Sequence, residues 1–425
     1  MILSRFTCAL SGTLLFAASA VAADWPQWQG PDRTNISRET GLLKDWPSDG
    51  PPLAWKKTKL GGGYSAPSIS NGRIFGMSFR GDDEVVWALS ESNGEEQWST
   101  VIGPAAKKEI QPQGHEGPRC TPTVDGDTIY ALGVLGQLVC LKASDGQEVW
   151  HKNLKKDFGG HWMAGWGYCE SPLVDGDKLI CTPGGSDATT VALDKHTGEP
   201  IWKSQVERNN GAGYASPIVI NAAGHKQYVH FIQGGPIGVD AETGKVLWHS
   251  SKGSNAIANC DTPIFSDDCV FVTSAYGGGC ALVKLEKDGP DGVKADPIYD
   301  NKKMQNHHGG VILLNGYLYG ASGGNEGGNL ECLEFQTGEV KWSERGKGDE
   351  ARKGGITMAD GRLYYRQESG TMTLLEPSPE KYIEHGRFEQ PDRSKASAWT
   401  HPVIANGKLY LRDQDALFCY DVKAK

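Results

Sequence analysis

The sequence has few of the features that mark known catalytic or nucleic-acid-binding sites. It contains no Cys-x-x-Cys, Gly-x-Ser-x-Gly, phosphate-binding loop or His-Glu-x-x-His motif, so no motif supports structural zinc, covalent haem, hydrolase or nucleotide chemistry. It also has no basic stripe. The 425 residues carry 43 Lys and Arg against 52 Asp and Glu, a net charge of −9. That balance argues against nucleic acid or an anionic membrane as a partner.

Long hydrophobic runs are also scarce, and the one present is at the N-terminus. Residues 1–23 contain Arg5, a short apolar run and then small residues up to Ala22 and Ala23. This pattern predicts a secretory signal peptide cleaved after Ala22 or Ala23, because the run is too short to span a membrane. Cys8 comes too early, and in the wrong context, for bacterial lipid attachment. We therefore expect an exported soluble protein, periplasmic or secreted, that is not a lipoprotein and has no membrane span.

Glycine and tryptophan, by contrast, are abundant. The chain has 56 Gly and 13 Trp, a pairing that suits many short strands joined by tight turns. A single compact core stops growing at roughly 250–300 residues, so a chain of this length is either multidomain or a repeat array. A search for self-similarity favours the repeat array.

The first recurring element is an Asn-Gly or Asp-Gly turn between two hydrophobic strands. This is the strongest short signal for a hairpin, because a type I′ turn needs positive φ at both central residues. Six copies are clear and two are degenerate, and together they recur about every 48 residues. The clear copies are Asn71-Gly72, Asp125-Gly126, Asp175-Gly176, Asn315-Gly316, Asp360-Gly361 and Asn406-Gly407, and the degenerate ones are Ala222-Ala223-Gly224 and Asp267-Asp268.

A second Gly-containing turn appears in six units, and in five of them a Trp follows the Gly by four residues. A tryptophan at a fixed place in every repeat is best explained by docking between neighbouring units, so we interpret this set as structural. Tyr299 and Phe388 stand in where the repeat is irregular. The docking tryptophans are Trp98, Trp150, Trp202, Trp248 and Trp342, with Trp55 taking the same place for the last unit.

Eight units of four strands predict an all-β, eight-bladed β-propeller of antiparallel blades. The last unit supplies only three strands before the chain stops, and residues 53–57 can provide the fourth. We therefore expect the ring to be closed by strands from both termini, which removes the open seam. The predicted organisation is a signal peptide at 1–23, an extended arm at 24–52 and the propeller at 53–425.

These units resemble the PQQ-type (pyrroloquinoline quinone) repeat. Its tryptophan-docking motif stands here as Ala192-Leu-Asp194-Lys-His-Thr197-Gly198-Glu-Pro-Ile-Trp202. The resemblance covers about residues 50–425 and includes the PQQ-dependent dehydrogenases and the assembly lipoprotein BamB. Those dehydrogenases use an adjacent-cysteine disulfide, a calcium held by Glu, Asn and Asp, and often a haem domain. This chain has no adjacent cysteines or haem motif, and no calcium ligand set is recognisable, so neither PQQ nor calcium is predicted as its cofactor.

Aligning the units on the small-Pro pair that opens each first strand locates a candidate binding site. In propellers the loop before that strand lies at the mouth of the central channel. The residue three before the Pro, or before the equivalent Gly, varies between units and is mostly polar or aromatic. This ring is Tyr64, Arg119, Cys169, Tyr214, Cys260, His307, Arg352 and Trp399, and the flanking loops add His115, Trp166, Tyr168, Asn259, Asp261, His308, Lys353 and His401.

The variable ring has two interpretations. It is either a ligand-binding funnel, or a set of residues that cap strand starts and bond to neighbouring loops. His307 and His308 suggest a metal pair, but neighbours on a strand point to opposite faces. We therefore expect one to face the channel and the other a loop, and we predict no metal site. Cys169 and Cys181 lie on one hairpin and are the pair to watch for a disulfide.

The function favoured by the sequence is that of a monomeric, non-catalytic binding or scaffold protein. Its channel mouth would take a protein, a saccharide or another small molecule. The alternative is an oxidoreductase like the PQQ-dependent alcohol or polyol dehydrogenases, for which no catalytic residue can be named. If the arm closes one end of the channel, the funnel becomes a blind pocket, which favours a small ligand.

Overall fold

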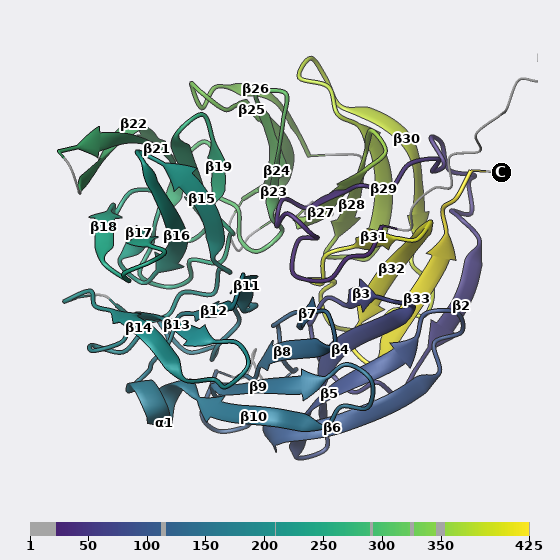
Figure 1. The fold of residues 1–425 in the computed structure, drawn as a ribbon. Coiled ribbons are helices and arrows are strands. Elements are labelled where there is room, and N and C mark those ends of the chain that lie inside the picture. Colours follow the sequence, from purple (N-terminus) through teal and green to yellow (C-terminus); the bar gives the residue numbers. More distant parts are fainter. Residues whose placement is uncertain are drawn as a thin grey trace, which may run out of the picture.

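The strands of this chain form a ring of eight blades around a central axis (Figure 1). The computed structural model describes residues 23–111, 116–208, 210–289, 292–323, 327–345 and 353–424. Each blade has four antiparallel strands, and blade 7 gains a fifth, parallel strand from the arm. The predicted all-β, eight-bladed propeller is confirmed. Residues 1–22 lie outside the described residues, so the signal peptide stays a prediction.

The first four blades contain one short helix between blades 2 and 3. Blade 1 is β3 (Ser68–Ser70), β4 (Arg73–Arg80), β5 (Asp83–Ser90) and β6 (Glu96–Pro104). Blade 2 is β7 (Thr123–Asp125), β8 (Thr128–Leu132), β9 (Gln137–Lys142) and β10 (Glu148–Asn153), followed by α1 (Leu154–Phe158). Blade 3 is β11 (Leu173–Asp175), β12 (Lys178–Cys181), β13 (Thr190–Asp194) and β14 (Pro200–Ser204). Blade 4 is β15 (Ile218–Ala222), β16 (His225–Ile232), β17 (Gly235–Asp240) and β18 (Val246–His249).

The other four blades include two strands from the N-terminal region. Blade 5 is β19 (Ile264–Ser266), β20 (Cys269–Ser274), β21 (Gly279–Asp288) and β22 (Gly292–Asn301). Blade 6 is β23 (Val311–Leu314), β24 (Tyr317–Ser322), β25 (Asn329–Glu334) and β26 (Val340–Glu344). Blade 7 is β27 (Gly354–Ala359), β28 (Arg362–Gln367), β29 (Thr371–Glu376) and β30 (Ile383–Glu389), with β1 (Ile36–Ser37) beside β27. Blade 8 is β31 (Val403–Ala405), β32 (Lys408–Asp413), β33 (Ala416–Asp421) and β2 (Leu53–Lys57).

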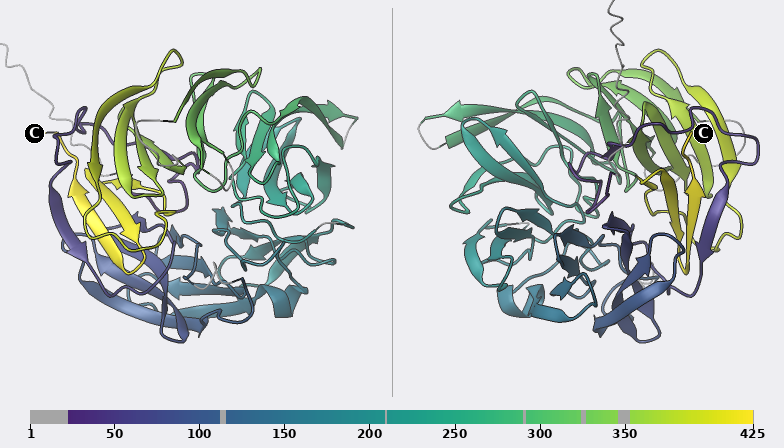
Figure 2. Two further views of the ribbon diagram at one scale, coloured as in Figure 1. Left: turned by 180° about the vertical axis from the view of Figure 1, so that it is seen from behind. Right: turned by 45° about the vertical axis from the view of Figure 1, so that its right-hand side comes forward.

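The ring closes through blade 8, as the sequence predicts. β2 pairs antiparallel with β33, from Leu53 opposite Tyr420 to Lys57 opposite Leu417. The purple-blue β2 lies beside the yellow C-terminal strands in Figure 1 and in both views of Figure 2. Backbone hydrogen bonds therefore join the two ends of the propeller, and no blade edge is left open at the junction.

The hairpin turns are of two kinds rather than one. In six units both central residues have positive φ, as a type I′ turn requires; for example, Asn71 has φ 51° and Gly72 has φ 72°. In the turns at Asp125-Gly126 and Asp175-Gly176 the ladder continues one residue further. Asp125 pairs with Thr128, so Gly126 (φ 57°) is the first of the two turn residues. The prediction of type I′ geometry was wrong for these two turns, because their aspartates remain in the strand.

The core lies between neighbouring blades, and the aromatic residues after the second turn occupy those contacts. Their polar atoms bond the next blade: Trp98 Nε1 donates to Ala143 O at 3.1 Å, and Trp150 Nε1 donates to Lys195 O at 2.9 Å. Tyr299 takes the same role through its hydroxyl, which donates to Phe335 O at 3.0 Å. A turn glycine of the next blade packs on five of these rings: Gly94 on Trp55, Gly146 on Trp98, Gly198 on Trp150, Gly244 on Trp202 and Gly338 on Tyr299. The same hydrogen bond from the indole Nε1 to a carbonyl oxygen of the next blade joins Trp55 to Glu91, Trp202 to Ala241 and Trp342 to Ser378.

Trp248 is the exception in this series. Its Nε1 donates to Gln227 Oε1 at 2.7 Å, within its own blade 4, and not to a carbonyl of blade 5. The neighbouring blade differs at this point, because β21 and β22 form a long hairpin that extends through Asp288 and Gly292. In the other blades the turn between the third and fourth strands contacts the docking ring of the preceding blade. In blade 5 this turn lies at the far end of the long hairpin.

The nine cysteines of the described residues all carry free thiols. Cys140, Cys332 and Cys419 are buried on the third strands of their blades, where they act as small apolar side chains. Cys169 and Cys181 are not bonded. The pairing of Leu173 with Ile180 places Cys181 level with Pro172, three residues from Cys169, so the hairpin does not bring the two thiols together.

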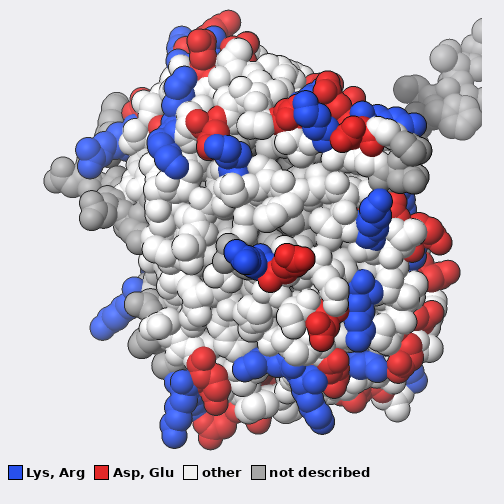
Figure 3. Space-filling view, turned by 90° about the vertical axis from the view of Figure 1, so that its left-hand side faces the viewer, with Lys and Arg blue, Asp and Glu red and all other residues white. Residues whose placement is uncertain are grey.

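The outer wall of the propeller carries charges of both signs. On the face shown in Figure 3, Lys and Arg lie among Asp and Glu toward the upper and lower rims, and the middle has few charged side chains. Within the described residues, no helix has the length and apolarity needed to cross a membrane.

Candidate functional site

The central channel contains a cavity of about 570 Å³. Every blade contributes to its wall through the loop that leads into its first strand, the position that the sequence alignment singled out. The volume is within the usual range for small-molecule sites, roughly 300–1,000 Å³. The cavity is lined by Trp28, Tyr64, Arg119, Trp166, Cys169, Tyr214, Ser216, Ala258, Cys260, Tyr276, His307, His308, Lys353, Glu368, Ser397, Trp399 and His401.

The N-terminal arm forms the floor of this cavity. The dark purple segment runs from the rim to the centre of the ring (Figures 1 and 2). There Trp28 packs on His401 with ring centroids 4.6 Å apart, and its Nε1 donates to Thr262 Oγ1 at 2.9 Å. Because Trp28 itself lines the cavity, the arm is part of the site.

Hydrogen bonds fix the arm to seven of the eight blades. Arg33 is fully buried and donates to three carbonyls at the inner strands of blades 3 and 4, including Ser171 O at 3.1 Å and Pro217 O at 2.9 Å. The remaining contacts follow the same pattern around the ring. They join Trp25 to Ile69, Pro26 to Val124, Trp28 to Thr262, Asn35 to Met358 and Ser37 to Ile404. The arm therefore crosses one end of the channel as a plug.

One wall of the cavity is a chain of aromatic and imidazole rings. Tyr276, His307, His308, Trp399 and Tyr64 follow one another with successive centroids 4.6–5.2 Å apart. This chain crosses loops from blades 5, 6, 8 and 1. Neighbouring rings restrict one another, so the wall offers a preorganised surface for stacking.

The opposite wall is smaller and apolar. Trp166 meets the edge of Tyr214 at a centroid distance of 5.8 Å, and the Tyr214 hydroxyl donates to Met163 O. Cys169 and Cys260 flank this pair, and burial raises the pKa of the Cys169 thiol to about 11. The thiol therefore stays protonated near neutral pH and acts as part of the apolar surface.

Charged groups concentrate around Glu368. Trp399 Nε1 donates to its Oε1 at 2.7 Å, Lys353 Nζ lies 3.6 Å from Oε2, and His308 Nε2 lies 3.3 Å from Oε1. Burial alone would raise the pKa of this carboxyl. The contacts with His308, Lys353 and Trp399 instead hold the pKa of Glu368 down at about 2, so it is ionised at all ordinary pH values.

The histidines of the cavity differ from what the sequence predicts. Both His307 and His308 line the cavity, because they lie in the loop before β23, where the alternation of a strand does not apply. The expectation that one of them faces away was wrong. Burial, followed by His308 and Lys353, lowers the pKa of His307 to about 2, and burial lowers that of His401 to about 4. These two rings are neutral imidazoles at neutral pH.

Not every predicted site residue reaches the cavity. Tyr168, Asn259 and Asp261 are buried behind its wall: the Tyr168 hydroxyl donates to Pro183 O at 2.8 Å, and Asn259 Nδ2 donates to Ile232 O at 2.9 Å. Each of them neighbours a residue that does line it. For these three residues the capping interpretation fits better than the binding one. His115 and Arg352 lie outside the described residues.

Several residues of the cavity wall were not predicted by aligning the first strands of the repeats. Tyr276 and Glu368 lie in loops between the second and third strands of blades 5 and 7. In an up-and-down blade those loops lie on the same face as the loops that enter the first strand. The predicted topology could therefore have identified Tyr276 and Glu368 as candidates for the cavity wall. Trp28 comes from the arm and has no repeat position. The others are Ser216, Ala258 and Ser397.

The described residues of the cavity wall do not form a calcium site of the kind the resemblance implies. Calcium takes six to eight oxygen ligands. Glu368 is the only carboxylate among the described lining residues, and its oxygens already contact Trp399, His308 and Lys353. Asn259 and Asp261 point elsewhere. The donor set is instead rich in imidazole nitrogen.

Fold and site together define a propeller of the PQQ-like class whose central cavity is closed at one end by the N-terminal arm. The chain belongs to the family described as "Outer membrane protein assembly factor BamB", whose sequence profile matches residues 105–344.

Two curated relatives and one solved structure illustrate this similarity. BamB of Burkholderia pseudomallei is 26% identical over 246 residues, which cover 54% of this chain and 57% of the relative. The quinoprotein ethanol dehydrogenase of Pseudomonas aeruginosa is 24% identical over 212 residues, which cover 42% of this chain and 32% of the enzyme. The matched segment thus spans somewhat more than half of the BamB relative and about a third of the dehydrogenase. Quinohemoprotein alcohol dehydrogenase from Comamonas testosteroni has the same fold, with a TM-score of 0.64, 14% identity and coverage of 96% of this chain and 82% of that one.

Proposed function

We propose that this protein binds a small ring-bearing molecule, such as a saccharide, in its central cavity. The observation that carries the proposal is the construction of the site: loops from all eight blades form the wall, and the arm forms the floor. A pocket closed at one end encloses a small ligand, whereas a peptide or a protein surface needs an open groove.

The wall composition indicates the chemistry of the ligand. Trp166, Trp399 and Tyr64 present aromatic faces and edges, which suit the apolar faces of a sugar or another ring. Lys353 and Glu368 supply a small number of fixed polar groups, the arrangement that gives orientation in small-molecule sites.

A screen of monosaccharides, disaccharides and cyclic acids against the purified protein tests the proposal. Binding should raise the melting temperature and change tryptophan fluorescence, because Trp166 and Trp399 lie in the wall. Removal of either ring should weaken binding by about 2- to 10-fold, since a stacking contact contributes roughly 0.5–1.5 kcal/mol. Trp98→Phe is the matched control, because that ring lies between blades 1 and 2.

Two outcomes contradict the proposal. The first is a screen in which no compound shifts the melting temperature. The second is a bound compound whose affinity is the same in Trp166→Ala and Trp399→Ala variants that remain folded.

A protein partner is the other form of the binding hypothesis, and the similarity to BamB, an outer membrane protein assembly factor, favours it. Such a partner would use the outer surface. Large exposed apolar side chains there include Ile201 on β14 and Ile298 on β22, each 47% exposed. Single exposed residues of this kind are common on monomers. A pull-down with an assembly partner whose strength changes on Ile201→Lys, but not on Trp166→Ala, would support this form instead.

The similarity to quinoprotein dehydrogenases supports a second candidate, a PQQ-dependent oxidoreductase. Among the described lining residues Glu368 is the only carboxylate, which does not match the oxygen donor set of a calcium site and stands against this candidate. Addition of PQQ and calcium to the purified protein tests it directly. A quinone absorption band with dye-linked alcohol oxidation would favour the enzyme over the binding protein.

A further inference from the structure

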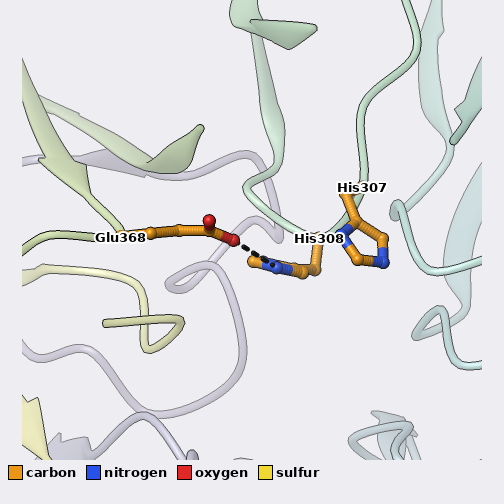
Figure 4. A group of neighbouring side chains, drawn as sticks. All are labelled: His307, His308 and Glu368. Carbon is orange, nitrogen blue, oxygen red and sulfur yellow. Dashed lines mark ion pairs between the residues drawn. The ribbon is translucent and has the colours of Figure 1, made fainter. Parts of the chain in front are cut away.

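A cluster of metal-ligating side chains lies on the cavity wall, where two histidines of the ring chain meet Glu368. The proposed function uses Glu368 only as a polar contact and gives the two histidines no role. His307 and His308 come from the loop before β23, and Glu368 comes from the loop after β28. One ligand atom from each lies within 4.8 Å of the other two. Figure 4 shows the Glu368 carboxylate and the His308 ring pointing toward one another, with the His307 ring beside them.

We propose that His307, His308 and Glu368 bind a first-row divalent transition-metal ion, Zn²⁺ or a close analogue, on the wall of the central cavity. Two imidazoles and one carboxylate are a ligand set that such ions favour, whereas Ca²⁺ and Mg²⁺ favour oxygen donors. The proposal does not depend on the cavity ligand proposed above.

The spacing of His308 and Glu368 fits two ligands of one ion. The distance from His308 Nε2 to Glu368 Oε1 is 3.3 Å. Two donors at bond lengths of about 2.0–2.2 Å and a near-tetrahedral angle are separated by roughly 3.2–3.6 Å. Glu368 is the contact of His308 Nε2, and Nδ1 of the same ring is buried without a hydrogen-bond partner. A buried polar atom without a partner is costly, and metal coordination would supply one.

His307 is oriented as a third ligand. Its Nε2 contacts the Tyr276 hydroxyl at 3.2 Å, and its Nδ1 is buried without a hydrogen-bond partner. Histidine ligands commonly bond an outer group through the second ring nitrogen, which fixes the ring and its tautomer. Nδ1 is therefore the nitrogen left for the ion.

Outer contacts also hold the carboxylate. Trp399 Nε1 donates to Glu368 Oε1, and the Lys353 ammonium lies 3.6 Å from Oε2. The Lys353 ammonium competes with a metal ion for this carboxylate, and its positive charge repels the ion. Three protein ligands leave a fourth position open, as in metal sites that accept an exogenous ligand, and here that position faces the cavity.

The test is titration of Zn²⁺ into metal-free protein without a His tag, followed by calorimetry, with Co²⁺ as a spectroscopic substitute. We expect one ion per chain, a visible absorption band typical of tetrahedral Co²⁺, and no displacement by excess Ca²⁺ or Mg²⁺. His308→Gln and Glu368→Gln should each lower the affinity by at least ~10-fold, because even outer-shell changes commonly cost 10–100-fold.

Two further variants separate this site from nonspecific binding. Lys353→Met should raise the affinity for Zn²⁺, because it frees Glu368 and removes the repulsion. His385→Gln is the matched control, since its ring lies 2.7 Å from Asp45 and 3.0 Å from Glu376, away from the cavity. It should change nothing.

The proposal is overturned if Zn²⁺ does not bind, or if a folded His308→Gln or Glu368→Gln variant keeps the affinity of the unmodified protein. It is also overturned if binding is lost in His385→Gln instead. Thermal melts of each variant without metal identify any that fail to fold. Because His308→Gln and Glu368→Gln alter different blades, one folded variant is enough to decide.

Discussion

Two positions recur around this ring and behave in opposite ways. The position four residues after the second turn is nearly uniform, and its aromatic rings hold neighbouring blades together, as Trp150 does through Lys195. The position three residues before the Pro or equivalent Gly that opens the first strand is different in almost every blade, and its described side chains gather around one cavity. In a repeat protein, uniformity marks what every unit needs for packing, and variation marks what the ring presents to something else.

The largest effect should come from breaking a docking contact. Trp150→Ala leaves a cavity between blades 2 and 3 and removes the partner of the Lys195 carbonyl. We expect a loss of about 3–5 kcal/mol, as for other buried Trp to Ala changes, measured by denaturant unfolding. Trp166→Ala in the cavity wall should cost much less stability. Equal losses in the two variants would erase the distinction between the positions.

The next effect concerns the arm. Arg33→Met removes hydrogen bonds to three buried carbonyls, each of which costs roughly 1–3 kcal/mol when left unsatisfied. The melting temperature should fall, and a protease should cleave the arm faster. Arg38→Ala breaks an ion pair with Asp32 in which both side chains are more than half exposed, so its stability should change by no more than ~0.5 kcal/mol. Unchanged proteolysis of the Arg33 variant would mean that the arm is not held by this residue.

A pH effect should arise at the contact between blades 1 and 2. Glu84 is fully buried and accepts from Val134 N at 3.0 Å, and burial raises its pKa to about 8. The folded state therefore keeps a proton that the unfolded chain releases above its usual carboxyl pKa of about 4.3. Stability falls as pH rises from that value toward 8, because the unfolded state binds fewer protons over this window.

Glu84→Gln removes this titration. Relative to the unmodified protein, the variant should gain melting temperature at pH 8 and lose that advantage at pH 4. The measurement is a series of thermal melts across this range. If the difference in melting temperature between the two proteins did not change with pH, Glu84 would not titrate between pH 4 and pH 8.

The smallest effect should come from the cysteines. All nine in the described residues are free, and only Cys169 and Cys260 are partly exposed. Cys169→Ser should leave the melting temperature nearly unchanged, both with and without a reductant. Thiol counting by mass should find no bridge between Cys169 and Cys181. A melting temperature that drops in reductant would contradict the pairing of β11 with β12.

The sequence was sufficient for the architecture because hairpin turns and docking rings are local signals. Asn71-Gly72 specifies its turn by itself, and eight copies specify the ring. The same alignment located Tyr64, Tyr214 and Trp399 in the cavity wall, since their places are tied to the start of a strand. Arg119, Trp166, Lys353 and His401 are also in the wall.

The remainder of the site depends on contacts that no repeat encodes. Trp28 reaches the cavity only because the arm folds back across the channel, and Glu368 meets His308 across two blades. Asp261 failed as a wall residue for the opposite reason: it neighbours Cys260 in the chain but is buried behind the wall, where burial raises its pKa to about 8. Direction of a loop side chain is set by tertiary packing, and sequence position alone does not give it.

The most direct test of the central claim is a crystal structure of the protein soaked with a compound from the ligand screen. The account predicts density for the compound between the Trp166–Tyr214 pair and the ring chain at Trp399, above Trp28. Density confined to the outer wall of the blades, with this cavity unoccupied at saturating compound, would contradict it.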